Sequence, residues 1–204
     1  MNAPYGGALD DLLQTGAHVR VLRALVGLPS GYAASTRDLA RRAGVAHTTA
    51  ARVLQSLAAR RVVDGEHAGR SDLYRLNDEH VLVGPLRTLY ASEAAFGASL
   101  VAYLRSEVPR HLSDAESAYL FGSASRGEMR RGSDVDVAVV APIAASEERE
   151  SALSTLAQKV RARYGAELNV VVTPGRASPV GKRGLLERAI AEGTPLFSKR
   201  HRNG

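Results

Sequence analysis

Apolar residues in the first third of the chain recur at the spacing of helix faces. Those in residues 9–26 predict a first amphipathic helix, which Gly27 and Pro29 close. A short second helix is expected over residues 37–43, before Gly44. A third helix is predicted by a stripe at i, i+3, i+4 and i+7, formed by Ala50, Val53, Leu54 and Leu57. Two further apolar segments, 62–63 and 73–76, predict the strands of a hairpin.

The middle of the chain has the pattern of a single long helix. Gly84-Pro85 marks its start and the next proline is Pro109, so one helix is expected across about residues 80–108. Leu82, Leu89, Phe96 and Tyr103 are spaced by sevens. The interleaved series is only half apolar, which is too broken for a coiled coil. We expect this helix to pack on the first module or against the same helix of a second subunit in a homodimer.

The last third predicts strands and helices that follow one another closely. Strands are expected at 119–121, 137–140, 167–173 and 194–198, with helices at 147–164 and 180–193. The whole pattern predicts an α/β (α+β) protein in which a small mixed sheet is flanked by helices. We expect three parts: residues 1–79, a linker or dimerisation helix over 80–110, and residues 111–204.

The order helix, helix, turn, helix, hairpin is that of a winged helix. Residues 44–57 resemble the helix-turn-helix core of bacterial transcription regulators, which commonly read Gly-Val-Ser-x-x-Thr-Val-x-Arg-x-Leu-x-x-Leu. The matching positions are Gly44, Val45, Thr49, Arg52, Leu54 and Leu57. Ala46 stands where a capping serine is usual, so the helix start is expected to be less well capped, by about 1 kcal/mol.

The resemblance implies that the third helix enters the major groove of double-stranded DNA. The residues placed to reach bases or phosphates are Thr48, Thr49, Arg52 and Gln55. Phosphate contact is expected from Arg60, Arg61 and Arg70. The alternative is a winged helix that contacts protein or forms a dimer.

Two carboxylates and a Gly-Ser turn are the candidate chemistry of the last third. Asp134 and Asp136 are two apart in the predicted strand and therefore project from one face. Two hard oxygen ligands beside Gly122-Ser123 suit Mg²⁺ and a nucleoside triphosphate. The alternative is a hairpin whose acidic residues merely face solvent.

Residues 112–198 resemble the minimal, antitoxin-like members of the DNA polymerase β nucleotidyltransferase superfamily. The elements that match in order are Phe121-Gly122-Ser123, Arg126-Gly127, Ser133-Asp134-Val135-Asp136 and Val137. The resemblance implies that Gly122 lets the backbone approach the phosphates and that Ser123 hydrogen-bonds them. It also implies that Arg126 neutralises phosphate charge, that Ser133 belongs to the nucleotide site, and that Asp134 and Asp136 hold Mg²⁺.

The third carboxylate that this family uses has no direct counterpart here. Alignment of the strand over 167–173 puts Asn169 at that position. An amide neither acts as a general base nor adds negative charge. Glu167 lies two residues earlier, on the same face, and is the candidate substitute. The catalytic candidates are Asp134, Asp136, Glu167 and Asn169.

Composition agrees with a nucleic-acid or nucleotide partner. The net charge is +6, which favours polyanions. The absence of cysteine fits a cytoplasmic protein, and no apolar run approaches the ~20 residues of a membrane span.

Two functions follow from the sequence. One is a DNA-binding transcriptional regulator whose nucleotidyltransferase moves a nucleoside monophosphate from a triphosphate to an acceptor hydroxyl. The other is a regulator whose transferase fold has lapsed and senses nucleotide or binds a partner; Asn169 leaves enzyme activity open.

Overall fold

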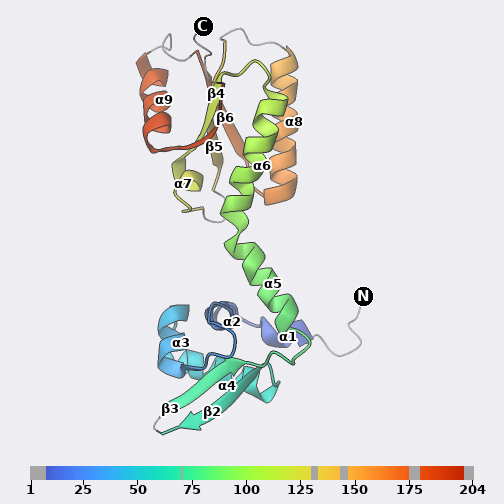
Figure 1. The fold of residues 1–204 in the computed structure, drawn as a ribbon, viewed down its shortest axis with the longest axis vertical. Helices are drawn as coiled ribbons and strands as arrows, with labels where there is room; N and C mark the ends of the chain where they lie inside the picture. Colours follow the sequence, from blue (N-terminus) through green and yellow to red (C-terminus); the bar gives the residue numbers. More distant parts are fainter. Residues whose placement is uncertain (1–7, 70, 130–132, 143–146, 175–179, 200–204) are drawn as a thin grey trace. The chain divides into compact units, whose positions relative to one another are not determined.

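The computed structural model describes residues 8–69, 71–129, 133–142, 147–174 and 180–199 (Figure 1). The chain divides into two compact units, Met1–Ala94 and Ala95–Gly204. Each unit has a hydrophobic core of its own. In the part of the chain that is described, no helix is both long and apolar enough to cross a membrane.

The first unit contains helices packed beside a small antiparallel sheet. Its elements are α1 Ala8–Leu12, α2 Gly16–Val26, β1 Ala34–Ser35, α3 Thr36–Ala43, α4 His47–Ala59, β2 Val63–Ala68, β3 Ser71–Leu76 and α5 Val83–Ala94. The strand order is β1-β3-β2, and both pairings are antiparallel. Helix, helix, turn, helix and hairpin thus follow in the predicted order, with β1 as an addition that the sequence pattern did not indicate.

Helix ends in this unit follow local capping chemistry. The single helix predicted over 9–26 is two helices, because Thr15 is extended and its hydroxyl accepts a hydrogen bond from the His18 amide at 3.4 Å. Ser35 caps α3 in the same way, accepting from the Asp38 amide at 3.2 Å. Helix α4 begins after Ala46, which supplies no side-chain cap. The weakly capped start expected from the sequence is therefore present.

The single helix predicted over residues 80–108 is also two helices. Helix α5 ends at Ala94, and α6 runs from Phe96 to His111. Ala95 between them is a turn residue with φ −82° and ψ −5°, and its carbonyl accepts the first hydrogen bond of α6 from the Ser99 amide at 2.8 Å. Pro109 lies inside the last turn of α6, so the helix continues past the residue that was expected to end it.

The second unit is a four-stranded mixed sheet with helices. Its elements are α6 Phe96–His111, β4 Ser117–Phe121, α7 Gly122–Ser125, β5 Val135–Val140, α8 Glu147–Tyr164, β6 Leu168–Thr173, α9 Val180–Glu192 and β7 Thr194–Ser198. The strand order is β6-β5-β4-β7. Strand β4 is antiparallel to β5 and β7, whereas β5 and β6 are parallel. The predicted α/β class with a small mixed sheet is confirmed.

Helices cover both faces of this sheet. Helices α6 and α8 lie on one face and α9 on the other (Figure 1). Alternate residues of β5 face α6 and α8 and are buried in one core with residues of both helices: Leu100, Leu104, Val135, Val137, Val139, Leu156 and Val160. Because side chains alternate along a strand, the intervening β5 residues, which include Asp136, point to the α9 face.

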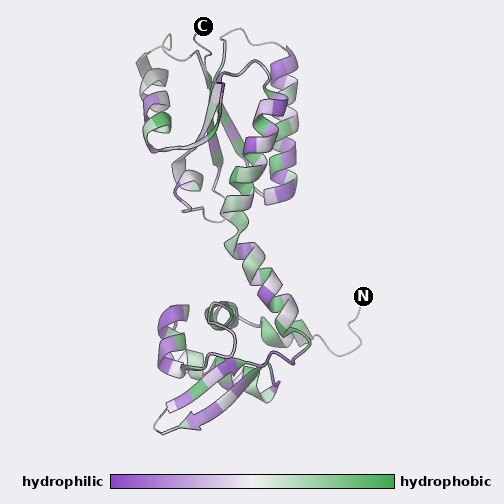
Figure 2. Ribbon diagram, viewed as in Figure 1, coloured by the Kyte–Doolittle hydropathy of each residue, from purple (hydrophilic) through white to green (hydrophobic). Residues whose placement is uncertain are grey.

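Hydrophilic residues dominate the colouring of α8, and likewise of β2 and β3 in the first unit (Figure 2).

Candidate functional sites

Strand register aligns three side chains across the sheet of the second unit. Phe121 on β4 is paired with Asp136 on β5, and Asp136 is paired with Asn169 on β6. Directly paired residues of neighbouring strands project to the same face. Because Asp136 points to the α9 face, Phe121 and Asn169 do so as well. The sheet therefore presents an aromatic ring, a carboxylate and an amide side by side on one surface.

The amide of Asn169 lies against both aspartates. Its Nδ2 atom donates to Asp134 Oδ2 at 3.2 Å and to Asp136 Oδ1 at 3.4 Å. Asp134 immediately precedes β5, so the expectation that both aspartates lie within the strand is corrected at its first residue. The amide nitrogen offsets the mutual repulsion of two carboxylates that converge on it. The structure thus brings Asp134, Asp136 and Asn169 together.

Glu167 is engaged elsewhere. Its carboxylate pairs with Arg161 of α8 at 3.0 Å, and its backbone carbonyl accepts from the Val135 amide at 2.8 Å. Among the described residues, no three His, Cys, Asp or Glu side chains are grouped so that they could hold a metal. The oxygen-rich cluster is therefore two carboxylates and one amide.

Gly122 places backbone directly beside the acidic cluster. It has φ +74°, a conformation that favours glycine, and it is the first residue of the short helix α7, directly after β4. A Cβ atom at this position would lie 2.7 Å from Asp136 Oδ2. A side chain at position 122 would therefore displace the Asp136 carboxylate. The missing side chain leaves room for a ligand to reach the backbone and the carboxylate together.

The remaining residues of the predicted nucleotide site surround this turn. Ser123 follows Gly122, is half-buried, and its carbonyl accepts from the Glu128 amide at 2.9 Å. Arg126 follows α7, is exposed, and its Nε donates to Glu128 Oε2 at 2.9 Å. Ser133 is half-buried and immediately precedes Asp134. Arg126 is thus an accessible cation that a ligand anion would have to share with Glu128.

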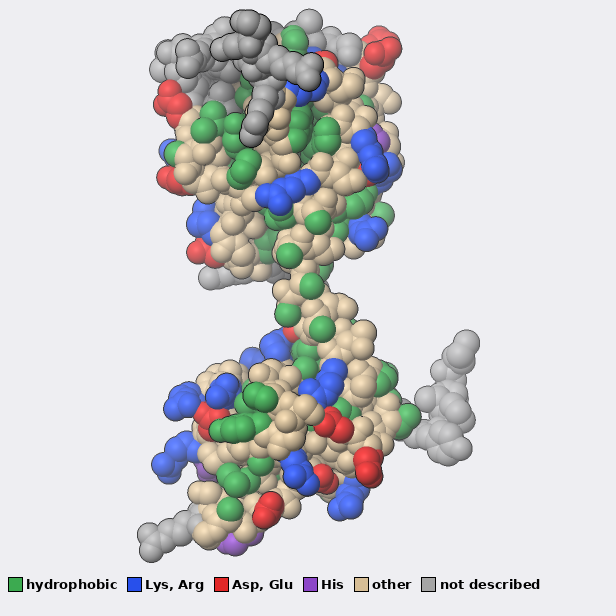
Figure 3. All heavy atoms as spheres, in the orientation of Figure 1, with side chains coloured by type: hydrophobic (Ala, Val, Ile, Leu, Met, Phe, Trp, Pro, Cys, Tyr) green, Lys and Arg blue, Asp and Glu red, His purple; other side chains and the backbone are tan. Residues whose placement is uncertain are grey.

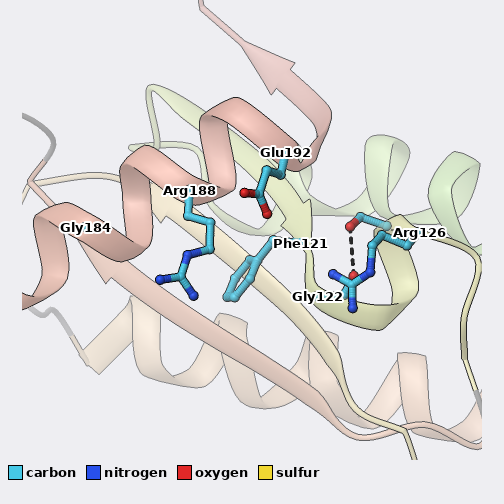
Figure 4. A pocket seen from close by; sticks show the side chains of 7 residues that line it. Phe121, Gly122, Arg126, Gly184, Arg188 and Glu192 are labelled. Carbon is cyan, nitrogen blue, oxygen red and sulfur yellow. Dashed lines mark hydrogen bonds between the residues drawn. The ribbon is translucent and has the colours of Figure 1, made fainter.

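A cavity of about 450 Å³ lies next to Gly122, between the sheet and α9 (Figure 4). Its lining includes Phe121, Gly122, Arg126, Arg188 and Glu192. Sequence reasoning did not single out Arg188 and Glu192. They lie four residues apart in the predicted helix over 180–193, and this spacing indicates that they share one face of the helix. The sequence pattern does not indicate which element packs against that face.

The predicted DNA-contacting residues of the first unit lie on α4 and just after it. Thr48, Arg52 and Gln55 are exposed and Thr49 is half-buried, while Ala50, Val53, Leu54 and Leu57 are buried on the opposite side. The helix therefore presents a polar face with one arginine to solvent. Arg60 Nη1 donates to the carbonyl and hydroxyl of Ser56 at 3.2 and 3.1 Å. Arg61 is exposed with φ +59°, and Arg70 lies outside the described residues.

The hairpin of β2 and β3 carries more acid than expected for a phosphate-contacting wing. Its described residues include Asp64, Glu66 and Asp72. His67 Nδ1 lies 2.7 Å from Asp72 Oδ1, and Arg75 Nε lies 3.6 Å from Asp64 Oδ2. Acidic and basic side chains are interspersed on the face shown in Figure 3. Carboxylates repel phosphate, so the polar face of α4 is better suited to DNA than the hairpin strands.

Comparison with known proteins places a family match within the second unit. Residues 101–191 match the family model described as "Nucleotidyltransferase domain". A comparison with curated proteins found no match. A crystal structure of a toxin–antitoxin with AMP-PNP is 25% identical, with a TM-score of 0.34, over 47% of this chain and 74% of that one. A crystal structure of a mutant of the toxin–antitoxin MntA-HpeT is 24% identical, with a TM-score of 0.34, over 51% of this chain and 74% of that one. The family match includes the Gly-Ser turn, both aspartates and Asn169.

Proposed function

We propose that this chain, whose residues 101–191 form a nucleotidyltransferase domain, binds a nucleoside triphosphate with Mg²⁺ through its second unit. We propose further that it binds duplex DNA through the first unit, and so acts as a DNA-binding regulator that also handles nucleotides. The observation that carries the nucleotide site is the convergence of Asp134 and Asp136 beside the bare backbone of Gly122.

The donor set fits a hard divalent cation. Two carboxylates supply negative oxygen ligands, and rotation of the Asn169 amide would present its neutral oxygen to the same point. Asp134 and Asp136 would hold Mg²⁺, which when bound offsets phosphate charge and polarises the phosphoryl group. Gly122 leaves space for the phosphates, while Ser123 and Arg126 are placed on the turn beside them. Ser133 precedes the acidic pair on its other side.

Transfer of a nucleoside monophosphate requires more than binding. The acceptor hydroxyl oxygen forms a bond to the α-phosphorus, the bond to pyrophosphate breaks, and the hydroxyl proton passes to a base. Asn169 cannot take that proton, and the Glu167 carboxylate is paired with Arg161. The remaining bases of the cluster are the two aspartates. The residues therefore support nucleotide binding more directly than they support rapid turnover.

The position of Asn169 favours a second candidate function for the same unit. An amide that donates to both aspartates adds no negative charge where a third carboxylate would increase it. In this second candidate the unit keeps the transferase fold but has lost transferase activity. It senses nucleotide, or binds a partner, and so regulates the DNA-binding unit. The two candidates share the binding step and differ in turnover.

Calorimetric titration of ATP and GTP in Mg²⁺ tests the shared step. We expect binding that requires Mg²⁺ and is lost in Asp136→Asn, since that change removes one of the two negative ligands. Equal binding by wild type and Asp136→Asn would contradict the assigned cation site. Incubation with α-labelled triphosphate and candidate acceptors then separates the candidates. Label transferred by wild type and not by Asp134→Asn supports the transferase, and binding without transfer supports the sensor.

DNA binding by the first unit rests on the polar face of α4. Thr48, Arg52 and Gln55 are exposed there in the element order of a winged helix. A helix with short hydroxyl side chains, an amide and an arginine offers donors and acceptors that can hydrogen-bond to base edges in the major groove. Arg61 lies just after α4 and is exposed, so we expect it to contact phosphate.

A further inference from the structure

The cavity beside Gly122 has polar groups that the phosphate and cation contacts leave unassigned. Phe121 enters it from β4, and Arg188 and Glu192 enter it from α9. The two α9 residues are four apart and so lie on the same side of the helix. Figure 4 shows both side chains extending toward the Phe121 ring. An aromatic face, a guanidinium and a carboxylate therefore line one space of about 450 Å³.

This cavity adjoins the proposed phosphate site at Gly122. Gly122 lines the cavity and also lies against Asp136, because a Cβ on Gly122 would be 2.7 Å from Asp136 Oδ2. Phe121 is the strand partner of Asp136. A nucleotide whose phosphates lie at Gly122 and the aspartates can therefore extend its base along the α9 face toward Phe121.

We propose that this cavity receives the base of the bound nucleotide and selects guanine. The inference rests on the proposed function, because it needs phosphates bound at Gly122. A base has a flat face that stacks on an aromatic ring, and stacking on Phe121 is open to every base. Selection must then come from the edge of the base, where Arg188 and Glu192 supply opposite hydrogen-bonding character.

Guanine matches this pair of side chains and adenine opposes it. Guanine presents two acceptors, O6 and N7, next to two donors, N1–H and the N2 amino group. The Arg188 guanidinium donates to the acceptors and the Glu192 carboxylate accepts from the donors, each with two hydrogen bonds. Adenine places an amino donor where Arg188 donates and an N1 acceptor where Glu192 accepts. Adenine keeps the N7 acceptor, so its binding would lose one of the two Arg188 hydrogen bonds and would leave the Glu192 carboxylate facing another acceptor.

The test compares Mg²⁺-dependent binding of GTP and ATP to the full chain by calorimetry. We expect GTP to bind at least about tenfold more tightly than ATP, since a well-placed bidentate pair discriminates by roughly that factor or more. Glu192→Ala should remove most of the preference by weakening GTP and leaving ATP nearly unchanged. The matched control is Glu150→Ala on α8, which also removes one exposed carboxylate from the same unit and should keep the preference.

Each outcome bears on a different statement. ATP and GTP bound equally by wild type would overturn guanine selection and leave the nucleotide site standing. A GTP preference that persists in Glu192→Ala would overturn the assignment of the base to this cavity. Binding of neither nucleotide would overturn the proposed function together with this inference. A second variant, Phe121→Leu, should weaken GTP and ATP alike, and unchanged affinity for both would place the base elsewhere.

Discussion

At position 169 an amide nitrogen stands between two carboxylates. The Asn169 amide donates at 3.2 and 3.4 Å to Asp134 and Asp136, which keeps the pair together without a cation. A carboxylate at the same place would repel both neighbours and would attract divalent cations more strongly. An amide at position 169 therefore gives a cluster that is stable without a cation, whereas a carboxylate there would give one that depends on a metal.

Asn169→Asp should make the second unit dependent on divalent cations. We expect its melting temperature to fall in chelator and to rise with Mg²⁺, and its affinity for Mn²⁺ to increase by about tenfold or more. Calorimetry and the paramagnetic resonance signal of free Mn²⁺ measure these effects without any reaction. Gln158→Glu, at an exposed position of α8 in the same unit, is the control for an added charge, and its Mn²⁺ affinity should match wild type. An Asn169→Asp variant with wild-type cation affinity would contradict the assigned cluster.

His18 should make the stability of the first unit sensitive to pH. The ring is buried, its Nδ1 lies 3.0 Å from Thr15 Oγ1, and among the described residues its Nε2 is buried with no hydrogen-bond partner. Burial, and then the charge of Arg60, lower the pKa of His18 below 6.5. Since the unfolded chain takes up the proton first, the stabilisation is complete above about pH 6.5 and is lost as pH falls toward the lower folded pKa.

The measurement is the free energy of unfolding of the first unit in denaturant at several pH values. We expect it to decline as pH falls below 6.5 in wild type, and to decline less in His18→Asn, which has no group that titrates there. Equal pH dependence in the two proteins would show that other groups are responsible.

Residues that the sequence placed correctly in space are those fixed by strand geometry. Asp136 and Asn169 meet because register and alternation are set by apolar strand residues that the sequence displays, and Asp134 immediately precedes the same strand. Arg188 and Glu192 were missed because helix α9 has no strong apolar face in its sequence, so the pattern does not reveal which side meets the sheet. Glu167 was expected near the aspartates, but it precedes β6 and pairs with Arg161.

At the scale of elements, the sequence predicted most helices and strands and misplaced their interruptions. Two predicted long helices are each divided, at residues 13–15 and at Ala95. Apolar spacing continues across both breaks, so the pattern alone does not reveal them. Thr15 interrupts the first because a hydroxyl that caps the next helix requires extended backbone. Helix α8 and strand β7, by contrast, have the bounds that the sequence predicted.

The start of α4 can be strengthened by one hydroxyl. Ala46 has φ −62° and ψ 146°, which suits a capping residue, but it has no side-chain acceptor. Ala46→Ser should raise the free energy of unfolding of the first unit by about 1 kcal/mol, because its hydroxyl can accept from an unpaired amide of the first turn. Denaturant unfolding measures this gain. Ala59→Ser at the exposed end of the same helix should give no such increase, and equal effects of the two changes would rule out capping as the cause.

The exposed face of α4 makes a separate prediction about DNA. Arg52→Ala should weaken DNA binding by about tenfold or more at fixed salt, since an arginine that contacts base edges contributes roughly 1–3 kcal/mol. Gel-shift titration measures the change, and nucleotide binding should be unaffected. Arg20→Ala, which removes an exposed arginine from α2, is the matched control. Unchanged affinity in Arg52→Ala would show that α4 is not the DNA-contacting helix.

At the scale of the whole molecule, the described residues form two hydrophobic cores, one in each unit. We expect two calorimetric unfolding transitions, because each core is built from residues of one unit. A nucleoside triphosphate with Mg²⁺ should raise only the transition of the second unit, whereas a fall in pH below 6.5 should lower that of the first, which contains His18. The control is Asp136→Asn, in which nucleotide should move neither transition. Nucleotide that shifts the first unit's transition instead would place the site there.

The bridge at position 169 also has a consequence for inheritance. Codons for asparagine and aspartate differ only in their first base, so one nucleotide substitution converts this amide into the third carboxylate of the cluster. The fold needs no rearrangement for that change, since Asn169 already faces both aspartates. A lineage carrying this chain can therefore move between a cluster that is stable without metal and a three-carboxylate cluster in a single mutational step, in either direction.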